Sequence, residues 1–229
     1  MDGLANARDV TEAARGLKAG VLWRSDQPEP GDPAPQQLGQ WPPAHVVDLR
    51  EPQEVGGIHP LAAVSLVHSL PPGLQMNPFQ METEGLTPSY VQLVTAPVGQ
   101  AALVRAIAVV AGADGPVLVH CSAGKDRTGV TVALALSLVG VDRDAVMADY
   151  LRTGPNMPAV IQRLARHWAS LGMPVAPERI PHAAVEVSEP AMSAVFDVWS
   201  EAPGGVVEWY LSAGGAASTL DALQERLLV

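Results

Sequence analysis

The chain has 229 residues, of which 48% are apolar and 17% charged, and its formal net charge is −10. This composition is typical of a soluble globular protein and excludes a disordered or collagen-like chain. The acidic balance argues against a nucleic-acid binder or a protein held on anionic membranes, because those partners select basic surfaces. The single cysteine, Cys121, excludes an internal disulfide, a multi-thiolate zinc site and an iron–sulfur cluster.

The sequence predicts neither a cleavable signal nor a membrane span. Residues 1–20 carry acidic side chains and no long apolar core. No run reaches the ~18 consecutive apolar residues that a spanning helix needs. We therefore expect a cytoplasmic protein without stable membrane insertion, although export without a cleavable signal leaves no trace in a sequence. The length favours a single domain over residues 1–229, with 152–202 as the place for a lid or helical insertion.

The N-terminal half predicts two buried strands and two loops. Residues 18–26 form an apolar run that ends in a charged turn, and the Pro- and Gly-rich stretch after it predicts a loop. His45–Leu49 is a compact β-branched run that indicates a second buried strand, with Asp48 and Arg50 at its exit. Residues 71–87 show neither the helical nor the strand period, so we expect a mobile surface loop there.

The rest of the chain is mainly helical. Residues 88–111 predict two helices broken near Pro97. Residues 115–140 predict a buried strand, PVLVH, then a loop, CSAGKDRTG, then a buried helix closed by Gly140. Further helices are predicted at 142–150, at 158–171 and, as two or three short elements, in the tail, with 172–187 as a connector. The pattern predicts an α/β fold with a central, mostly parallel sheet flanked by helices and a helix-rich C-terminal half.

The loop between the predicted strand and helix carries the candidate chemistry. Backbone N–H groups at a helix N-terminus, together with the positive end of the helix dipole, form an anion site. Cys121 places a thiol at the end of the strand, and Arg127 supplies a guanidinium that can donate two hydrogen bonds to an oxyanion. The positive field favours the thiolate, which could attack phosphorus and form a phosphocysteine.

Two other loop types do not fit these residues. A nucleotide-binding Walker A loop needs a glycine and a Ser or Thr where Val119 and Asp126 stand. A serine-hydrolase elbow centred on Ser122 needs a glycine where His120 stands. Both functions are therefore disfavoured.

Residues 120–129, HCSAGKDRTG, resemble the H-C-x5-R-[ST]-G phosphate loop of the cysteine-dependent protein tyrosine phosphatase superfamily. Other segments resemble a bacterial atypical tyrosine phosphatase family with mycobacterial members; they are residues 6–9, 23–26, 48–50, 149–151 and 207–211. The resemblance implies a tyrosine-phosphatase-like fold and hydrolysis without metal or cofactor. The implied substrates are phosphotyrosine proteins and, for some members, phosphoserine, phosphothreonine or phosphoinositides.

The resemblance also implies roles for the loop residues. Cys121 would be the nucleophile, Arg127 the phosphate clamp, and Thr128 the hydroxyl that stabilises the departing thiolate. The loop backbone would bind substrate phosphate, or inorganic phosphate or vanadate, through Ser122, Ala123, Gly124, Lys125, Asp126 and Arg127. Thr128 is also counted among the phosphate-binding residues. Lys125 resembles a lysine in the loops of lipid phosphatases, which hints at a multiply phosphorylated or lipid-type substrate.

The general acid that protonates the leaving group is the open role. In the better-known phosphatases an Asp precedes the cysteine by roughly thirty to forty residues, and here that window holds only Glu82 and Glu84. Asp126 lies inside the loop, as in the myotubularin loops that it resembles. Asp48 ends a strand that could run beside the Cys121 strand. Both remain candidates, with Asp126 slightly preferred.

The remaining polar residues favour supporting roles, and two other functions stay open. Arg24 and Arg50 could assist substrate binding, but as arginines at strand ends they are rather expected in a supporting ion pair or hydrogen-bond network. His120 is expected to hold the loop through hydrogen bonds. The polar side of 158–171, with Arg163, Arg166 and His167, is expected to be a solvated face. The alternatives are a phosphate-binding module without a working general acid and a rhodanese-like sulfurtransferase, against which the complete loop motif argues.

Overall fold

The computed structural model describes residues 3–74, 85–176, 179–180 and 185–229. Its centre is a five-stranded sheet with the strand order β1-β2-β5-β3-β4. The strands are β1 (Arg8–Asp9), β2 (Leu22–Ser25), β3 (His45–Asp48), β4 (Leu66–Ser69) and β5 (Val117–His120). Only β1 runs antiparallel to its neighbour, and the other pairs are parallel. The predicted α/β class with a mostly parallel sheet is therefore confirmed.

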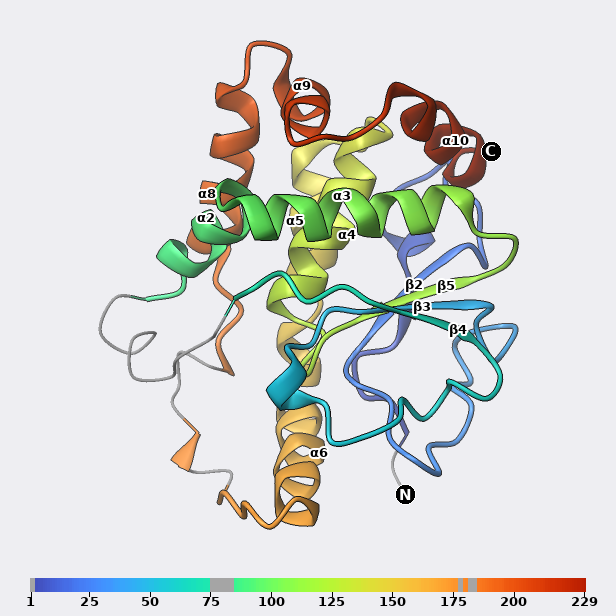
Figure 1. Cartoon of the computed structure of the whole chain (residues 1–229), viewed down its shortest axis with the longest axis vertical. Helices are drawn as coiled ribbons and strands as arrows, with labels where there is room; N and C mark the ends of the chain where they lie inside the picture. The colour runs from blue at the N-terminus through green and yellow to red at the C-terminus, as the bar shows by residue number, and fades with distance from the viewer. Residues whose placement is uncertain (1–2, 75–84, 177–178, 181–184) are drawn as a thin grey trace.

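Helices dominate the chain after β4, and in Figure 1 α3 crosses above the strands while α6 extends toward the lower end of the molecule. The described helices are α2 (Thr87–Thr95), α3 (Pro97–Gly112), α4 (Asp126–Leu138), α5 (Arg143–Leu151), α6 (Met157–Ser170), α8 (Glu189–Glu201), α9 (Gly205–Ser212) and α10 (Ala217–Leu227). Short 3₁₀ turns lie at Val10–Ala13, Pro52–Glu54 and Gly154–Asn156.

The sheet has two different faces because successive side chains of a strand point to opposite sides. Val117 and Val119 of β5 join the main core with side chains of α2, α3, α4, α8, α9 and α10. Leu118, between them, points the other way and packs with Trp23 in a smaller cluster with Leu4, Ala7 and Leu38. Helices therefore cover one face, and the N-terminal segment and loops cover the other.

The sheet register brings three strand ends together. His120, the last residue of β5, pairs with Ser25 at the end of β2 and with Asp48 at the end of β3. Parallel strands share the edge at which they end, so the segments that follow all three lie side by side. In open α/β sheets this edge is the usual position of a ligand site.

Most predicted elements appear close to their predicted bounds. The helical stretch after residue 87 breaks at Ala96, and Pro97 starts α3 at a first helical position, where its missing N–H is no loss. Helix α4 stops at Leu138, and Gly140 adopts the left-handed φ of +83° that the predicted stop requires. The sequence did not predict β1 and β4, because β1 has only two residues and β4 is a half-exposed edge strand without clear alternation.

Two predictions fall partly outside the described residues. Residues 75–84 of the predicted loop 71–87, with Glu82 and Glu84, lie outside, as do parts of the connector 172–187. Within the described residues, no single helix is long and apolar enough to cross a membrane. The pair α2 and α3, bent by 72°, meets that test jointly by length and composition only.

Candidate active site

The loop 121–125 joins the end of β5 to the start of α4, as the sequence predicted. Cys121 directly follows β5 and is 1% exposed, and α4 begins at Asp126. The N–H groups of the first turn of a helix have no intrahelical partner, so α4 presents them at this loop. The strand end, the loop and the helix start therefore have the arrangement on which the sequence-based prediction of an anion site depends.

Gly124 is needed for the shape of this loop. Its φ is +66°, in the left-handed region that side chains disfavour. A Cβ at this position would lie 2.2 Å from the carbonyl oxygen of Ser25, which no rearrangement of a side chain could relieve. The loop therefore packs directly on the backbone that follows β2, and Ser122 accepts a hydrogen bond from the Gln27 N–H at 3.1 Å.

A buried ion-pair network braces the loop from the N-terminal side. The carbonyl of Gly124 accepts hydrogen bonds from Arg24 Nη2 at 2.9 Å and from Asn6 Nδ2 at 3.0 Å. Asp149 pairs with Arg24 at 2.6 Å and with Arg8 at 2.8 Å. Burial raises the pKa of Asp149, but the two arginines outweigh it and hold that pKa below its usual value. Arg24 thus supports the loop, as the sequence favoured.

Arg127 is held by a carboxylate that the sequence did not single out. Glu54 accepts hydrogen bonds from Nη1 and Nη2 of Arg127 at 2.5 and 2.8 Å, and from the Ser122 hydroxyl at 2.7 Å. Arg127 Nη1 also donates to the Leu49 carbonyl at 3.1 Å. Burial alone would lower the pKa of Arg127, but the Glu54 hydrogen bonds and the charge on Cys121 raise it. Arg127 is therefore a permanently charged, oriented side chain beside the thiol.

Two buried polar atoms of the loop and first turn lack a hydrogen-bond partner within the described part of the chain. They are Nε of Arg127 and the hydroxyl of Thr128. Unpaired buried polar groups are costly, and a ligand bound in this loop would satisfy them. An oxyanion can accept from Arg127 Nε, and the sulfur of Cys121 from Thr128.

Comparisons with known proteins agree with this loop chemistry. A family model described as tyrosine phosphatase family matches residues 1–229. The chain belongs to the tyrosine phosphatase family. It is 37% identical over 134 residues to the triple specificity protein phosphatase PtpB of Mycobacterium tuberculosis, covering 58% of this chain and 48% of that protein. It is 29% identical over 190 residues to a Cupriavidus necator protein named provisionally as a tyrosine-protein phosphatase, covering 75% and 68%. The chain thus spans about half the length of the mycobacterial relative.

The structure distinguishes the two candidate acids of this tyrosine phosphatase family member. Both oxygens of Asp48 contact the Arg50 guanidinium, at 2.9 and 2.7 Å, and the residue is 3% exposed. Burial raises the pKa of Asp48, but the hydrogen bonds and charge of Arg50 help to place that pKa far below its usual range. Asp48 is therefore held ionised and paired, which suits a supporting residue and not a proton donor.

Asp126 is placed differently, beside Arg127 at the first position of α4. Its Oδ1 accepts a hydrogen bond from the Tyr90 hydroxyl at 2.7 Å and lies 3.4 Å from Lys125 Nζ. The side chain is 12% exposed. One carboxylate oxygen is thus anchored by the Tyr90 hydroxyl.

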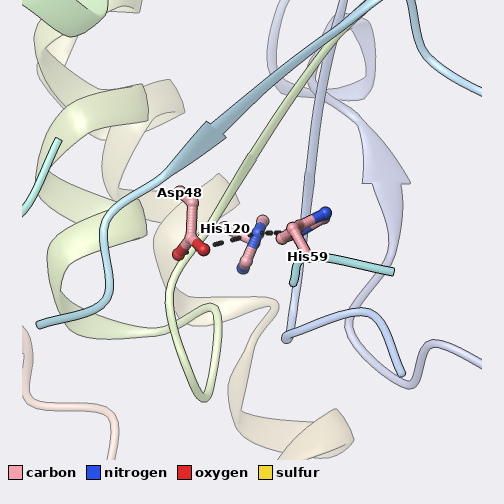
Figure 2. Close-up of side chains that lie close together, drawn as sticks. All are labelled: Asp48, His59 and His120. Atoms are coloured by element: carbon pink, nitrogen blue, oxygen red, sulfur yellow. Dashed lines mark hydrogen bonds and ion pairs between the residues drawn. The ribbon is translucent and has the colours of Figure 1, made fainter. Parts of the chain in front are cut away.

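His120 forms a chain of hydrogen bonds with His59, shown with Asp48 in Figure 2. The Leu61 N–H can only donate, so Nδ1 of His59 accepts and its Nε2 carries the proton. His59 Nε2 then donates to His120 Nε2 at 2.9 Å, and His120 Nδ1 donates to the Cys121 carbonyl at 3.1 Å. Burial above all lowers the pKa of both rings, that of His59 to about 4. His120 therefore holds the loop in its neutral form, as predicted.

Asp48, His59 and His120 also converge closely enough to raise the question of a metal ion. Their bonding does not fit one. The lone pair of His59 faces the Leu61 N–H, its Nε2 is a donor, and both Asp48 oxygens already contact Arg50. A cation here would have to displace hydrogen bonds that hold Cys121 in place.

The other predicted phosphate-binding residues lie in the loop, but the side chain of Lys125 is bonded to a different segment of the chain. Ser122 is bonded to Glu54, and Ala123 packs near Met157 and Val160 of α6. Lys125 is fully buried, and its ammonium donates to the Glu186 carbonyl at 2.9 Å. The lysine therefore ties the loop to the segment before α8, besides placing a positive charge beside Asp126.

The structure corrects the prediction for one side chain of α6. Arg163 was expected on a solvated face, but it is 3% exposed. It bonds Asp26 at 2.7 Å and Asp32 at 2.8 and 2.9 Å, because α6 packs on the loop after β2. Arg166 is exposed and His167 half-buried, as expected for the outer side of that helix.

Glu54, Tyr90 and His59 are the site residues that the sequence analysis missed. Each comes from a segment far along the chain from the loop that it contacts. One signal was present: Glu54 follows the exit of a strand predicted to be buried, and the carboxyl ends of parallel strands share one edge. Nothing in the local sequence marks Tyr90 or His59.

Proposed function

We propose that this chain is a phosphomonoester hydrolase that works through a phosphocysteine on Cys121. The observation that supports it most directly is the pairing of a buried thiol with an oriented arginine whose Nε has no partner in the described residues. Arg127 Nε and the N–H groups of the loop would bind the phosphoryl oxygens. These donors face the charge that develops during transfer, which is the main electrostatic contribution in such sites.

The reaction has two balanced steps. The Cys121 thiolate attacks phosphorus, the bond from phosphorus to the ester oxygen breaks, and that oxygen takes the proton of Asp126. Water then attacks the phosphocysteine, the Asp126 carboxylate takes a proton from this water, and the S–P bond breaks to release orthophosphate and the thiolate. The Thr128 hydroxyl stabilises the departing sulfur.

The proposed substrates are phosphotyrosine proteins, with phosphoserine, phosphothreonine and phosphoinositides as alternatives. The family supports a phosphorylated substrate, and the mycobacterial relative is named for triple specificity. A panel of phosphopeptides and phosphoinositide vesicles, compared by kcat/KM, would rank these classes.

Hydrolysis of 4-nitrophenyl phosphate tests the proposed function. We expect turnover in EDTA, inhibition by vanadate, and loss of turnover in Cys121→Ser, with a phosphate adduct on Cys121 in acid-quenched wild-type protein. Phosphate binding by the wild type without turnover would favour a binding module, and full activity of Cys121→Ser would exclude the mechanism.

A further inference from the structure

Two buried tyrosines connect Asp126 to the segment that precedes α8. Tyr90 on α2 and Tyr150 at the end of α5 are 0% and 1% exposed, and their hydroxyls lie 2.8 Å apart. Tyr90 contacts Asp126 Oδ1 at 2.7 Å, and Tyr150 contacts the Ser188 N–H at 3.2 Å. Four groups from four parts of the chain thus form one row.

The direction of every bond in this row follows from its two ends. The Ser188 N–H can only donate, so the Tyr150 oxygen accepts there. With Asp126 ionised, its Oδ1 can only accept, so the single hydroxyl proton of Tyr90 points to it. Tyr150 must then donate to the oxygen of Tyr90. In this order Tyr90 donates its only hydroxyl proton to Asp126.

The anchored oxygen decides which oxygen of Asp126 carries a proton. While Oδ1 accepts from Tyr90, the oxygen that can carry the transferable proton is Oδ2. When that proton leaves, negative charge forms on the carboxyl group, and the bond from Tyr90 becomes charge-assisted and stronger. An interaction that strengthens as the reaction proceeds accelerates the chemical step.

We propose that Tyr90, oriented by Tyr150, is a positioning residue for proton transfer from Asp126 to the leaving group. This inference rests on the proposed function. Tyr90 itself keeps its proton throughout, since burial and the nearby Asp126 charge raise the pKa of its hydroxyl well above the ordinary value. Burial also raises the pKa of Tyr150. The row is therefore a fixed support and not a proton wire.

Gly129 makes room for this arrangement. It lies one turn after Asp126 on α4, and a Cβ there would be 2.9 Å from Cδ2 of the Tyr150 ring. A glycine at this position thus lets the tyrosine pack against the helix that carries Asp126.

The test is the dependence of kcat/KM on the leaving group, since this constant reports the step in which the ester bond breaks. Phenol is a poor leaving group and needs an acid, whereas 2,4-dinitrophenol leaves readily without one. We expect Tyr90→Phe to lower kcat/KM for phenyl phosphate roughly tenfold, as for the loss of a hydrogen bond to a charged group. With 2,4-dinitrophenyl phosphate its kcat/KM should stay within about twofold of wild type, since little acid help is needed.

Three further variants complete the design. Tyr150→Phe, one bond further away, should show the same selective loss with a smaller amplitude, and it stands in if Tyr90→Phe does not fold. Tyr210→Phe, which removes a buried hydroxyl from α9, should leave both substrates unaffected. Asp126→Asn should lose about 100-fold or more with phenyl phosphate, and adding Tyr90→Phe to it should change nothing further.

The outcomes separate this inference from the proposed function. Three results would overturn the positioning role. Tyr90→Phe could lower kcat/KM equally for both substrates, it could lower kcat/KM for neither, or it could lower kcat/KM further in the Asp126→Asn background. An Asp126→Asn variant without leaving-group dependence would overturn it as well. In all of these cases hydrolysis of 2,4-dinitrophenyl phosphate that requires Cys121 would leave the phosphatase proposal standing. If the wild type does not hydrolyse 2,4-dinitrophenyl phosphate, both the phosphatase proposal and the positioning role of Tyr90 are overturned.

Discussion

Glu54 holds Arg127 through both terminal nitrogens of its guanidinium, at 2.5 and 2.8 Å, and leaves Nε directed elsewhere. Burial raises the pKa of Glu54, but the hydrogen bonds and charge of Arg127 lower it below its usual value. The carboxylate is therefore ionised and paired, and it limits the rotation of the arginine that would clamp phosphate. A guanidinium that is already oriented loses less conformational entropy when it binds phosphate than a freely rotating one.

Replacing Glu54 should weaken anion binding without removing any group that touches the anion. In Glu54→Ala we expect vanadate inhibition to weaken by roughly tenfold, as for the loss of hydrogen bonds to a charged group. Gln53 is an exposed neighbour in the same turn, and Gln53→Ala should bind vanadate like wild type. Unchanged vanadate inhibition in Glu54→Ala would show that Arg127 is oriented without this carboxylate.

Gly124 and Gly140 form a matched pair for testing the loop. Both have positive φ, +66° and +83°, but a Cβ at Gly140 would meet nothing within 4 Å. Gly140→Ala should lower the free energy of unfolding by about 1–2 kcal/mol for the left-handed backbone, and Gly124→Ala should lower it further because its Cβ also meets backbone atoms. Only Gly124→Ala should also abolish vanadate binding, because its Cβ would collide with the Ser25 carbonyl. Equal behaviour of the two variants in denaturant unfolding and vanadate titration would contradict this account.

Asp149 should matter far more to stability than a surface carboxylate in a similar pair. Asp149→Asn leaves Arg8 and Arg24 buried without their counter-charge, so a loss of about 3–5 kcal/mol in the free energy of unfolding is expected. Asp197 pairs with Arg143 at 2.9 Å, but these side chains are 61% and 49% exposed. Asp197→Asn should cost less than about 1 kcal/mol. Urea denaturation of both variants measures the difference.

The His59–His120 pair predicts a loss of stability in mild acid. The pKa of His59 is lowered to about 4 in the folded chain from an ordinary value near 6.5, and that of His120 is lowered as well. Between these values the unfolded chain binds more protons than the folded chain, so the free energy of unfolding falls as pH falls from about 6.5 toward 4. In His59→Gln this slope should become shallower. An unchanged slope between pH 4 and 6.5 would mean that His59 binds a proton equally in the folded and unfolded chains.

Much of the fold could be predicted because its signals are local. The apolar runs that became β2, β3 and β5, the break before Pro97 and the stop at Gly140 each depend on neighbouring residues. The edge strand β4 escaped prediction because its four residues, LVHS, are partly or fully exposed and show no clear apolar alternation. The burial of Arg163 escaped it because periodicity places a side chain on a helix face but does not say what packs against that face.

By itself, the sequence determined the chemical identity of the candidate site. The thiol, the arginine, the hydroxyl and Asp126 lie within eight consecutive residues, so a strand followed by a helix suffices to bring them to one loop. The tertiary structure alone decided what supports them. Placing β5 between β2 and β3 brought Arg24, Glu54 and Asp48 to the same edge, and packing α2 and α5 on α4 brought the tyrosines to Asp126. These contacts join residues 36 to 100 positions apart, and no local pattern encodes such pairings because they depend on which elements the whole core brings together.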